Sequence, residues 1–190
     1  MRSSHHVQFQ PVKIRDGLMN TAETQVLLED YITQAAKELF LDVSGFLFES
    51  IENSDWFPEI TAVLGIAGTC VAGSATLGTS ASCLATLAAK ANSDMPEDWL
   101  GELANQLVGR FKRRIVAHGV DFSLGTPTLI SGERLHVLSR FSHKPAFTVH
   151  LQSDIGRVEI WLEFELHHGG ELSAEPQDDG TLIEGEALLF

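Results

Sequence analysis

The sequence is poor in cysteine and in basic residues, and each shortage argues against a class of protein. Its two cysteines, Cys70 and Cys83, are too few for a disulfide framework, and their spacing suits no metal site. We expect both to be small buried hydrophobes in a reducing cytoplasm. Lys and Arg number 13 against 26 Asp and Glu, which gives a formal net charge of −13. This charge repels nucleic acid and anionic membranes, so neither is an expected partner.

Charged residues are absent between positions 60 and 89, a stretch long enough to raise the question of a membrane span. A transmembrane helix needs about 20 mostly apolar residues. Here the apolar residues are diluted by glycine, serine and threonine, so we interpret the stretch as two buried strands and a small-residue helix. The N-terminus has neither an apolar core nor a small-residue cleavage site, which argues against a signal peptide. We therefore expect a cytoplasmic protein.

Hydrophobic periodicity predicts a single domain over residues 20–168, between an N-terminal extension (1–19) and an acidic, solvated C-terminal tail (169–190). A helix is expected to begin at Asn20, which forms a capping-box signal with Glu23. The segment from Val43 is typical of a strand. Two paired strands follow, and Thr79 or Ser80 is expected to cap a short helix. The predicted paired strands span residues 59–65 and 69–77.

A longer helix is predicted from Glu97 to Val116. Ser93 and Asp94 supply capping side chains before it, and Pro96 suits its first turn. Four strand-like segments follow, and the last two alternate as a hairpin does. This order favours an α+β fold with an antiparallel-rich sheet, long helices packed on it, and a weak internal duplication. The four segments span residues 120–124, 133–142, 146–153 and 157–165.

The helix over residues 97–116 presents one unusual face. Its apolar residues form a continuous stripe that we expect to be buried, whereas Asp98, Glu102, Asn105 and Gly109 fall on the opposite side. Glu102 and Asn105 are three residues apart, so their side chains are neighbours. Gly109 costs about 1 kcal/mol relative to alanine inside a helix, yet it allows another surface to come close. From these residues alone, a contact site and a tolerant surface without function are equally good interpretations.

A carboxylate beside an amide has a chemical use in the hydrolysis of an acyl phosphate. The attacking water must lie in line with the leaving oxygen. An amide both donates and accepts hydrogen bonds, so it can orient water without titrating. A carboxylate can hold a lysine of a partner protein. The spacing Glu-x-x-Asn alone is common in helices and does not establish this chemistry.

The residues around this pair resemble a known family. Residues 97–109 resemble the signature helix of the CheX family, within the CheC/CheX/FliY group of chemotaxis phosphatases. That family's pattern is close to Gly-Glu-hydrophobic-small-Asn, followed four residues later by Gly. Residues 122–132 look like the family's "LPTVI-x-G" strand and turn, and the helix before Val43 resembles its opening helix, so the resemblance covers residues 20–168. The matching positions of the signature are Gly101, Glu102, Asn105 and Gly109.

The resemblance implies a phosphatase that removes the aspartyl phosphate from a CheY-type receiver domain. Glu102 would pair with the receiver's lysine and Asn105 would position the water. The magnesium would belong to the receiver, so we expect no cofactor or metal of the protein's own. A homodimer formed through the sheets is also implied. Related CheC proteins carry two such motifs, but residues 28–33 here contain no Glu-x-x-Asn, so one site per chain is predicted.

Two alternatives stay open. Lys112 and Arg113 add positive charge to the end of this face. The charge either complements the helix dipole or steers the protein toward an acidic pocket of the receiver. The predicted partner-binding residues are Asp98, Gly101, Gly109, Lys112 and Arg113. The second alternative concerns activity: a non-catalytic, CheX-like adaptor module would dock a signalling protein without hydrolysis. The histidines at 167 and 168 make a poor chelate, because adjacent strand residues point to opposite faces.

Overall fold

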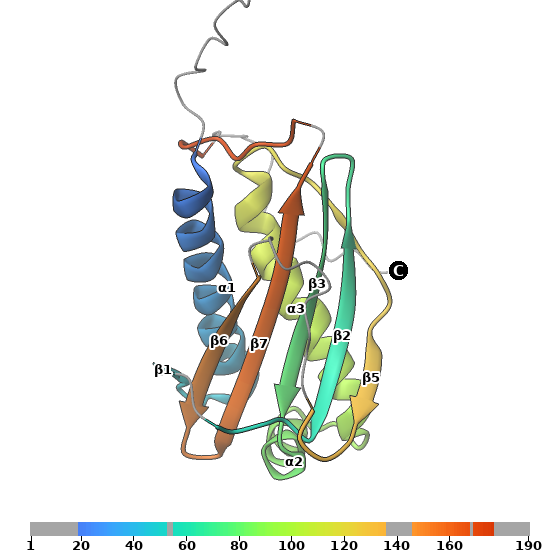
Figure 1. Ribbon diagram of the computed structural model, residues 1–190. Helices are drawn as coiled ribbons and strands as arrows, with labels where there is room; N and C mark the ends of the chain where they lie inside the picture. The colour runs from blue at the N-terminus through green and yellow to red at the C-terminus, as the bar shows by residue number, and fades with distance from the viewer. Residues whose placement is uncertain (1–18, 53–54, 136–145, 168, 177–190) are drawn as a thin grey trace, which may run out of the picture.

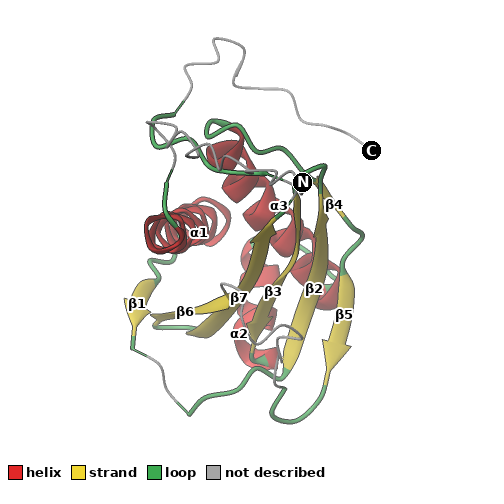
Figure 2. Cartoon of the chain, turned by 45° about the horizontal axis from the view of Figure 1, so that its top comes forward, coloured by secondary structure: helices red, strands yellow, loops and turns green. Residues whose placement is uncertain are grey.

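The computed structural model describes residues 19–52, 55–135, 146–167 and 169–176. Two long helices, α1 (Thr21–Ser44) and α3 (Pro96–Val116), lie side by side on one face of a seven-stranded sheet, and the shorter α2 (Ala81–Lys90) lies at one end (Figures 1 and 2). Every strand pairing is antiparallel. The predicted α+β class with an antiparallel sheet is confirmed. The strands are β1 (Glu49–Ile51), β2 (Ile60–Ala67), β3 (Val71–Thr79), β4 (Ser123–Leu124), β5 (Thr128–Ser131), β6 (Ala146–Ser153) and β7 (Gly156–Leu166).

Local signals place several of these elements as predicted. Asn20 caps α1: its side chain accepts from the backbone N–H of Glu23, and the Glu23 side chain accepts from that of Asn20. Ser80 caps α2, accepting from the Cys83 N–H at 3.2 Å. The stretch from 60 to 89 forms β2, β3 and α2, and none of the helices in the described ranges is long and apolar enough to cross a membrane.

Three predicted boundaries are wrong. Val43 belongs to the last turn of α1, which ends at Gly45 with a φ of +73°, a conformation that glycine adopts readily. The strand that follows is only the three residues of β1. Residues 120–124 contribute only the short β4, and the strand expected over 133–142 is absent from its described part, 133–135; the rest lies outside the described residues. Both β4 and β5 pair with β2.

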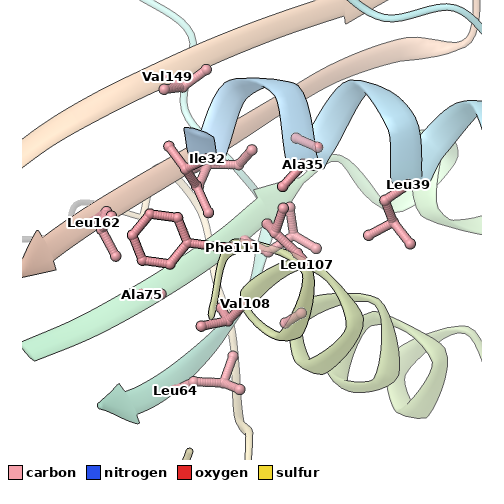
Figure 3. Packing of buried hydrophobic residues seen from close by; sticks show 14 of the residues in the cluster. Ile32, Ala35, Leu39, Leu64, Ala75, Leu107, Val108, Phe111, Val149 and Leu162 are labelled. Carbon is pink, nitrogen blue, oxygen red and sulfur yellow. The ribbon is translucent and has the colours of Figure 1, made fainter. Parts of the chain in front are cut away.

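The core lies between the helices and the sheet. Ile32 and Leu39 of α1 face Leu107 and Phe111 of α3, and α3 covers Leu64 of β2 (Figure 3). All five are fully buried. Truncating a buried phenylalanine such as Phe111 to alanine typically costs about 3–5 kcal/mol. The apolar stripe of α3 is therefore fixed against the sheet, and its opposite face must point outward.

The order of the strands agrees with the expected internal duplication. Along the sheet the order is β1-β6-β7-β3-β2-β4. Exchanging β1 with β4, β2 with β6 and β3 with β7 reproduces the same order read from the other edge. The same exchange swaps α1 and α3, so each long helix precedes one half of the sheet.

Two ion pairs between the antiparallel helices fix the equivalence. Arg110 Nη1 lies 2.7 Å from Asp42 Oδ2, and Arg114 Nη2 lies 2.7 Å from Glu38 Oε2. Adding 72 to the numbers of Glu38 and Asp42 gives Arg110 and Arg114. A two-fold exchange of the helices with this offset therefore turns one ion pair into the other.

The first residues of the expected tail pack against the domain. Leu172 is 1% exposed, and its carbonyl accepts from the Met19 N–H at 3.2 Å. The Ser173 N–H donates to the His118 carbonyl, and His118 Nδ1 lies 2.6 Å from the Ser173 carbonyl oxygen. The Tyr31 hydroxyl contacts the other ring nitrogen of His118 at 2.9 Å. Here the expectation of a solvated tail is corrected; residues 1–18 and 177–190 lie outside the described residues.

Candidate functional site on the outer face of α3

The predicted pair lies on the outer face of α3, as the periodicity required. Glu102 is exposed and Asn105 is half-buried, whereas Leu103 and Ala104 between them are buried. Three residues of helix separate the two polar side chains by about 4.5 Å along the axis. They are therefore neighbours that a partner can touch together.

The two side chains differ in how they are held. Gln106 Nε2 donates a hydrogen bond to Glu102 Oε1 at 2.9 Å, an interaction between residues four apart. This bond occupies one carboxylate oxygen and leaves the other for a cationic group. Within the described ranges, the Asn105 amide makes no hydrogen bond. Its carbonyl and its NH₂ are thus both available to water or to a partner.

Two glycines frame this pair in different ways. A Cβ built on Gly109 would meet nothing within 4 Å, so the position one turn beyond Asn105 opens onto empty space. Gly101 is buried, and a Cβ there would lie 3.5 Å from Pro127 Cβ. Pro127 precedes β5, in the segment that resembles the family's strand and turn. Gly101 thus contacts the chain's own loop, while Gly109 faces outward.

The basic end of the face is partly engaged within the chain. Lys112 Nζ lies 2.9 Å from Asp121 Oδ1 and 5.7 Å from the centre of the Phe122 ring. The hydrogen bond from Lys112 holds the pKa of Asp121 below its usual value. Arg113 is exposed and has no such contact in the described part of the chain. Of the two predicted basic contacts, only Arg113 leaves its charge uncommitted.

The acidic end of the face begins differently from the prediction. The N-cap of α3 is Met95, with no side-chain cap, whereas Ser93 and Asp94 were expected to cap. Ser93 Oγ instead accepts from the Met95 N–H at 3.4 Å, and Pro96 occupies the first turn as predicted. Asp98 is exposed one turn before Glu102. Sequence reasoning missed Met95; an apolar residue where capping side chains are favoured was the available signal.

No cluster suited to a metal ion occurs in the described residues, taking three or more His, Cys, Asp or Glu side chains as the requirement. His168 lies outside the described residues, so the His167–His168 pair is not described as a unit. Cys83 is buried and Cys70 is half-buried, and burial raises the pKa of the Cys83 thiol. The arrangement on α3 therefore offers a carboxylate, an amide and open space, which is chemistry for handling water and a partner's cation.

A family model supports the same assignment. The model described as "Chemotaxis phosphatase CheX" matches residues 60–152. Over these residues the chain is similar to CheX proteins. The matched range includes β2, β3 and all of α3. The predicted resemblance is therefore confirmed for the helix that carries the candidate face. No curated protein matches the chain in sequence.

Solved structures share the fold of this CheX-like chain. The chemotaxis protein CheX from Vibrio vulnificus is 16% identical with a TM-score of 0.65, and the alignment covers 73% of this chain and 99% of that one. A putative chemotaxis protein from Desulfovibrio vulgaris Hildenborough is 20% identical, with a TM-score of 0.61 and coverage of 73% and 97%. The CheX of a CheX-CheY-BeF3-Mg+2 complex from Borrelia burgdorferi is 19% identical, with a TM-score of 0.60 and the same coverage. These likenesses establish a common architecture.

Proposed function

We propose that this protein hydrolyses the aspartyl phosphate of a CheY-type receiver domain, with Asn105 orienting the water and Glu102 pairing with the receiver's lysine. The observation that carries the proposal is the uncommitted Asn105 amide beside Glu102, with open space at Gly109. The chemotaxis-phosphatase family model and the CheX-CheY complex among the structural relatives support it. The protein would act in the cytoplasm, where receiver domains operate.

The proposed step is the attack of one water on phosphorus. The amide of Asn105 accepts a hydrogen bond from the water and holds it in line with the aspartyl oxygen. The new P–O bond forms as the bond to the aspartate breaks, so the receiver regains its carboxylate and the water's proton goes to the released phosphate. Phosphoryl transfer of this kind depends on positioning and on charge neutralisation more than on covalent chemistry. The receiver would supply Mg²⁺, and this protein would need no cofactor of its own.

Glu102 would act on geometry and not on the reacting atoms. Its free carboxylate oxygen would accept from the receiver's lysine and so fix the register of the two proteins. Gly109 would let the receiver's backbone approach Asn105 within contact distance. Asp98 and Arg113 would extend the contact along the same helix face, while Gly101 and Lys112 would act through the loop and through Asp121.

The experiment is phosphate release from a phosphorylated, Mg²⁺-bound CheY-type receiver, with and without the protein. We expect acceleration by the wild-type protein and none by Glu102→Ala or Asn105→Ala, both folded as judged by melting temperature. The second candidate is a CheX-like adaptor that binds receivers without hydrolysis. Binding with no acceleration, across the receivers encoded in the same genome, would favour the adaptor.

A homodimer formed through the sheets is part of the proposal. The feature that supports it is the edge strand β5, which pairs with β2 and with no other strand in the described residues. Leu129 and Ile130 on this strand are 37% and 46% exposed. Light scattering should give twice the chain mass at micromolar concentration; a monomer mass across a wide concentration range would contradict the dimer.

A further inference from the structure

An open groove lies at the start of α3, immediately beside the proposed catalytic pair. It has a volume of about 430 Å³ and is lined by Ser93, Asp94, Met95, Asp98, Trp99 and Glu102. The lining joins the turn after α2 to the first two turns of α3. Because Glu102 belongs to both the groove and the proposed site, a protein docked at Asn105 would also cover the groove.

Met95 contributes an apolar surface that the fold does not use. Its side chain is 61% exposed, although it lies among charged and polar neighbours. It also occupies the N-cap of α3, where Ser, Thr, Asp or Asn would accept a hydrogen bond from the first turn. A methionine there forgoes that bond and leaves a large apolar side chain in water. Methionine is favoured at adaptable protein-binding surfaces, because its flexible thioether fits many contours.

Trp99 supplies the second apolar wall. It packs against the hydrophobic core and lines the groove at the same time. Its indole Nε1 is buried from solvent and has no hydrogen-bond partner in the described part of the chain. Buried indole N–H groups usually find an acceptor. The described part of the chain thus leaves a buried donor unpaired on a residue that lines the groove.

The charges around the groove are of one sign. Asp94, Asp98 and Glu102 contribute carboxylates, and no Lys or Arg is among the lining residues. A complementary surface is therefore apolar at its centre and basic at its rim. The groove therefore favours a protein surface over an anionic small molecule, because the carboxylates would repel the anion.

Resting on the proposed function, we infer that this groove is the second anchor of the receiver: it takes an apolar side chain flanked by lysine or arginine. Ten residues of helix separate Met95 from Asn105, which is about 15 Å along the axis. The receiver's apolar side chain should thus lie about that far from its phosphorylated aspartate. The groove governs affinity, and the Glu102–Asn105 pair governs the chemical step.

Met95→Ser separates these two roles. Serine can cap α3, so the variant should fold at least as well as the wild type, while the apolar anchor is removed. The probe is a CheY-type receiver from the same genome, loaded with Mg²⁺ and beryllofluoride, and the readout is Kd by titration calorimetry. We expect Kd to rise by at least about tenfold, as for removal of a central apolar anchor. The single-turnover rate at saturating phosphorylated receiver should stay within about twofold, because an interaction made equally in the ground and transition states does not affect that rate.

Val26→Ser is the matched control. Val26 is 69% exposed on α1, near the end of the antiparallel helix pair that is remote from the groove. This substitution should leave Kd unchanged. A second variant, Asp94→Asn with Asp98→Asn, should weaken binding at low salt and flatten the dependence of Kd on salt.

Each result decides one of the two proposals. An unchanged Kd for Met95→Ser, with a wild-type protein that binds and hydrolyses, would overturn the groove and leave the phosphatase intact. Wild-type binding without hydrolysis would overturn the phosphatase alone, and the Kd comparison would still decide the groove. If the wild-type protein binds none of the receivers, both proposals fall.

Discussion

The outer faces of α1 and α3 occupy equivalent places in the fold but carry different side chains. With the offset of 72 residues set by the two ion pairs, the buried residues Leu28 and Ile32 of α1 match Leu100 and Ala104 of α3. Each helix therefore turns the same side toward the sheet. Their outer faces can be compared position by position.

One feature is common to both faces. On α3, Gln106 donates to the carboxylate of Glu102; on α1, Gln34 Nε2 donates to Asp30 Oδ2 at 2.8 Å. The offset of 72 residues relates Asp30 to Glu102 and Gln34 to Gln106. A carboxylate oriented by a glutamine is thus shared by the two helices and does not by itself mark a site.

The next positions differ. Asn105 corresponds to Thr33, whose hydroxyl donates to the Glu29 carbonyl at 2.7 Å and is used within its own helix. Gly109 corresponds to Lys37, whose ammonium lies 3.1 Å from Glu49 Oε2. On α1 the polar group is committed and the neighbouring space is filled, whereas on α3, as far as the described residues show, the amide is unbonded and the space is open. A free amide and an open turn therefore distinguish the candidate site on α3, and their absence from α1 is why one site per chain is expected.

Exchanging the decisive residue should have the largest effect. Asn105→Thr should lower the single-turnover rate of phosphate release by on the order of 10²-fold or more, because threonine bonds back to its own helix and no longer orients water. The melting temperature should be unchanged. The reciprocal Thr33→Asn should keep full activity. Equal losses of activity from both exchanges would show that the two faces are not functionally distinct.

Filling the empty turn should have the next largest effect. Gly109→Lys should stabilise the helix by up to about 1 kcal/mol. It should nevertheless lower kcat/KM by about tenfold or more, since a displaced receiver misplaces the water. The matched variant Lys37→Gly should lose about 1 kcal/mol of unfolding free energy with no loss of activity. Urea unfolding and phosphate release measure the two quantities; normal kcat/KM in Gly109→Lys would mean that no partner approaches there.

The two related ion pairs predict small effects on stability, of the same order for both. Arg110→Gln and Arg114→Gln each remove one of two related, partly exposed pairs, so each should cost about 0.2–1 kcal/mol. Added salt should reduce both costs, because exposed charges are screened. A difference between the two variants well beyond this range would break the equivalence of the halves. Urea unfolding at low and high salt provides the test.

The smallest predicted difference concerns pH. His150 pairs with Glu159 in the β6–β7 hairpin, and the pair with the same nine-residue separation in the β2–β3 hairpin is Gly65–Ser74, which cannot titrate. Burial, and then the nearby Arg157, lowers the pKa of His150 below 6.5. The unfolded chain therefore binds this proton more readily, and stability falls as pH drops from 6.5 through the folded pKa.

His150→Gln should remove that part of the decline, as followed by melting temperature against pH. Burial raises the pKa of Glu159 above 4.5, which has the opposite sign: its contribution is present at low pH and is lost as pH rises through the folded pKa. Glu159→Gln should therefore flatten the profile above pH 4.5. A His150→Gln profile identical to that of the wild type would contradict the assignment.

Local chemistry made much of this molecule predictable. The Asn20–Glu23 capping box, the β6–β7 hairpin and the outward face of α3 each depend on residues close in sequence. The prediction of a strand from Val43 was wrong because an apolar run suits a helix end as well as a strand. The left-handed backbone conformation of Gly45 ends the helix there. The groove and the Pro127–Gly101 contact could not be predicted, because they join segments that only the folded sheet brings together.

The most direct test removes each face in turn and follows phosphate release from a phosphorylated CheY-type receiver under single-turnover conditions. One chain carries Glu102→Ala and Asn105→Ala, and the other carries Asp30→Ala and Thr33→Ala. We predict that the first releases phosphate no faster than the receiver alone and that the second matches the wild type. Wild-type activity in the first chain would contradict the assignment of the site to α3.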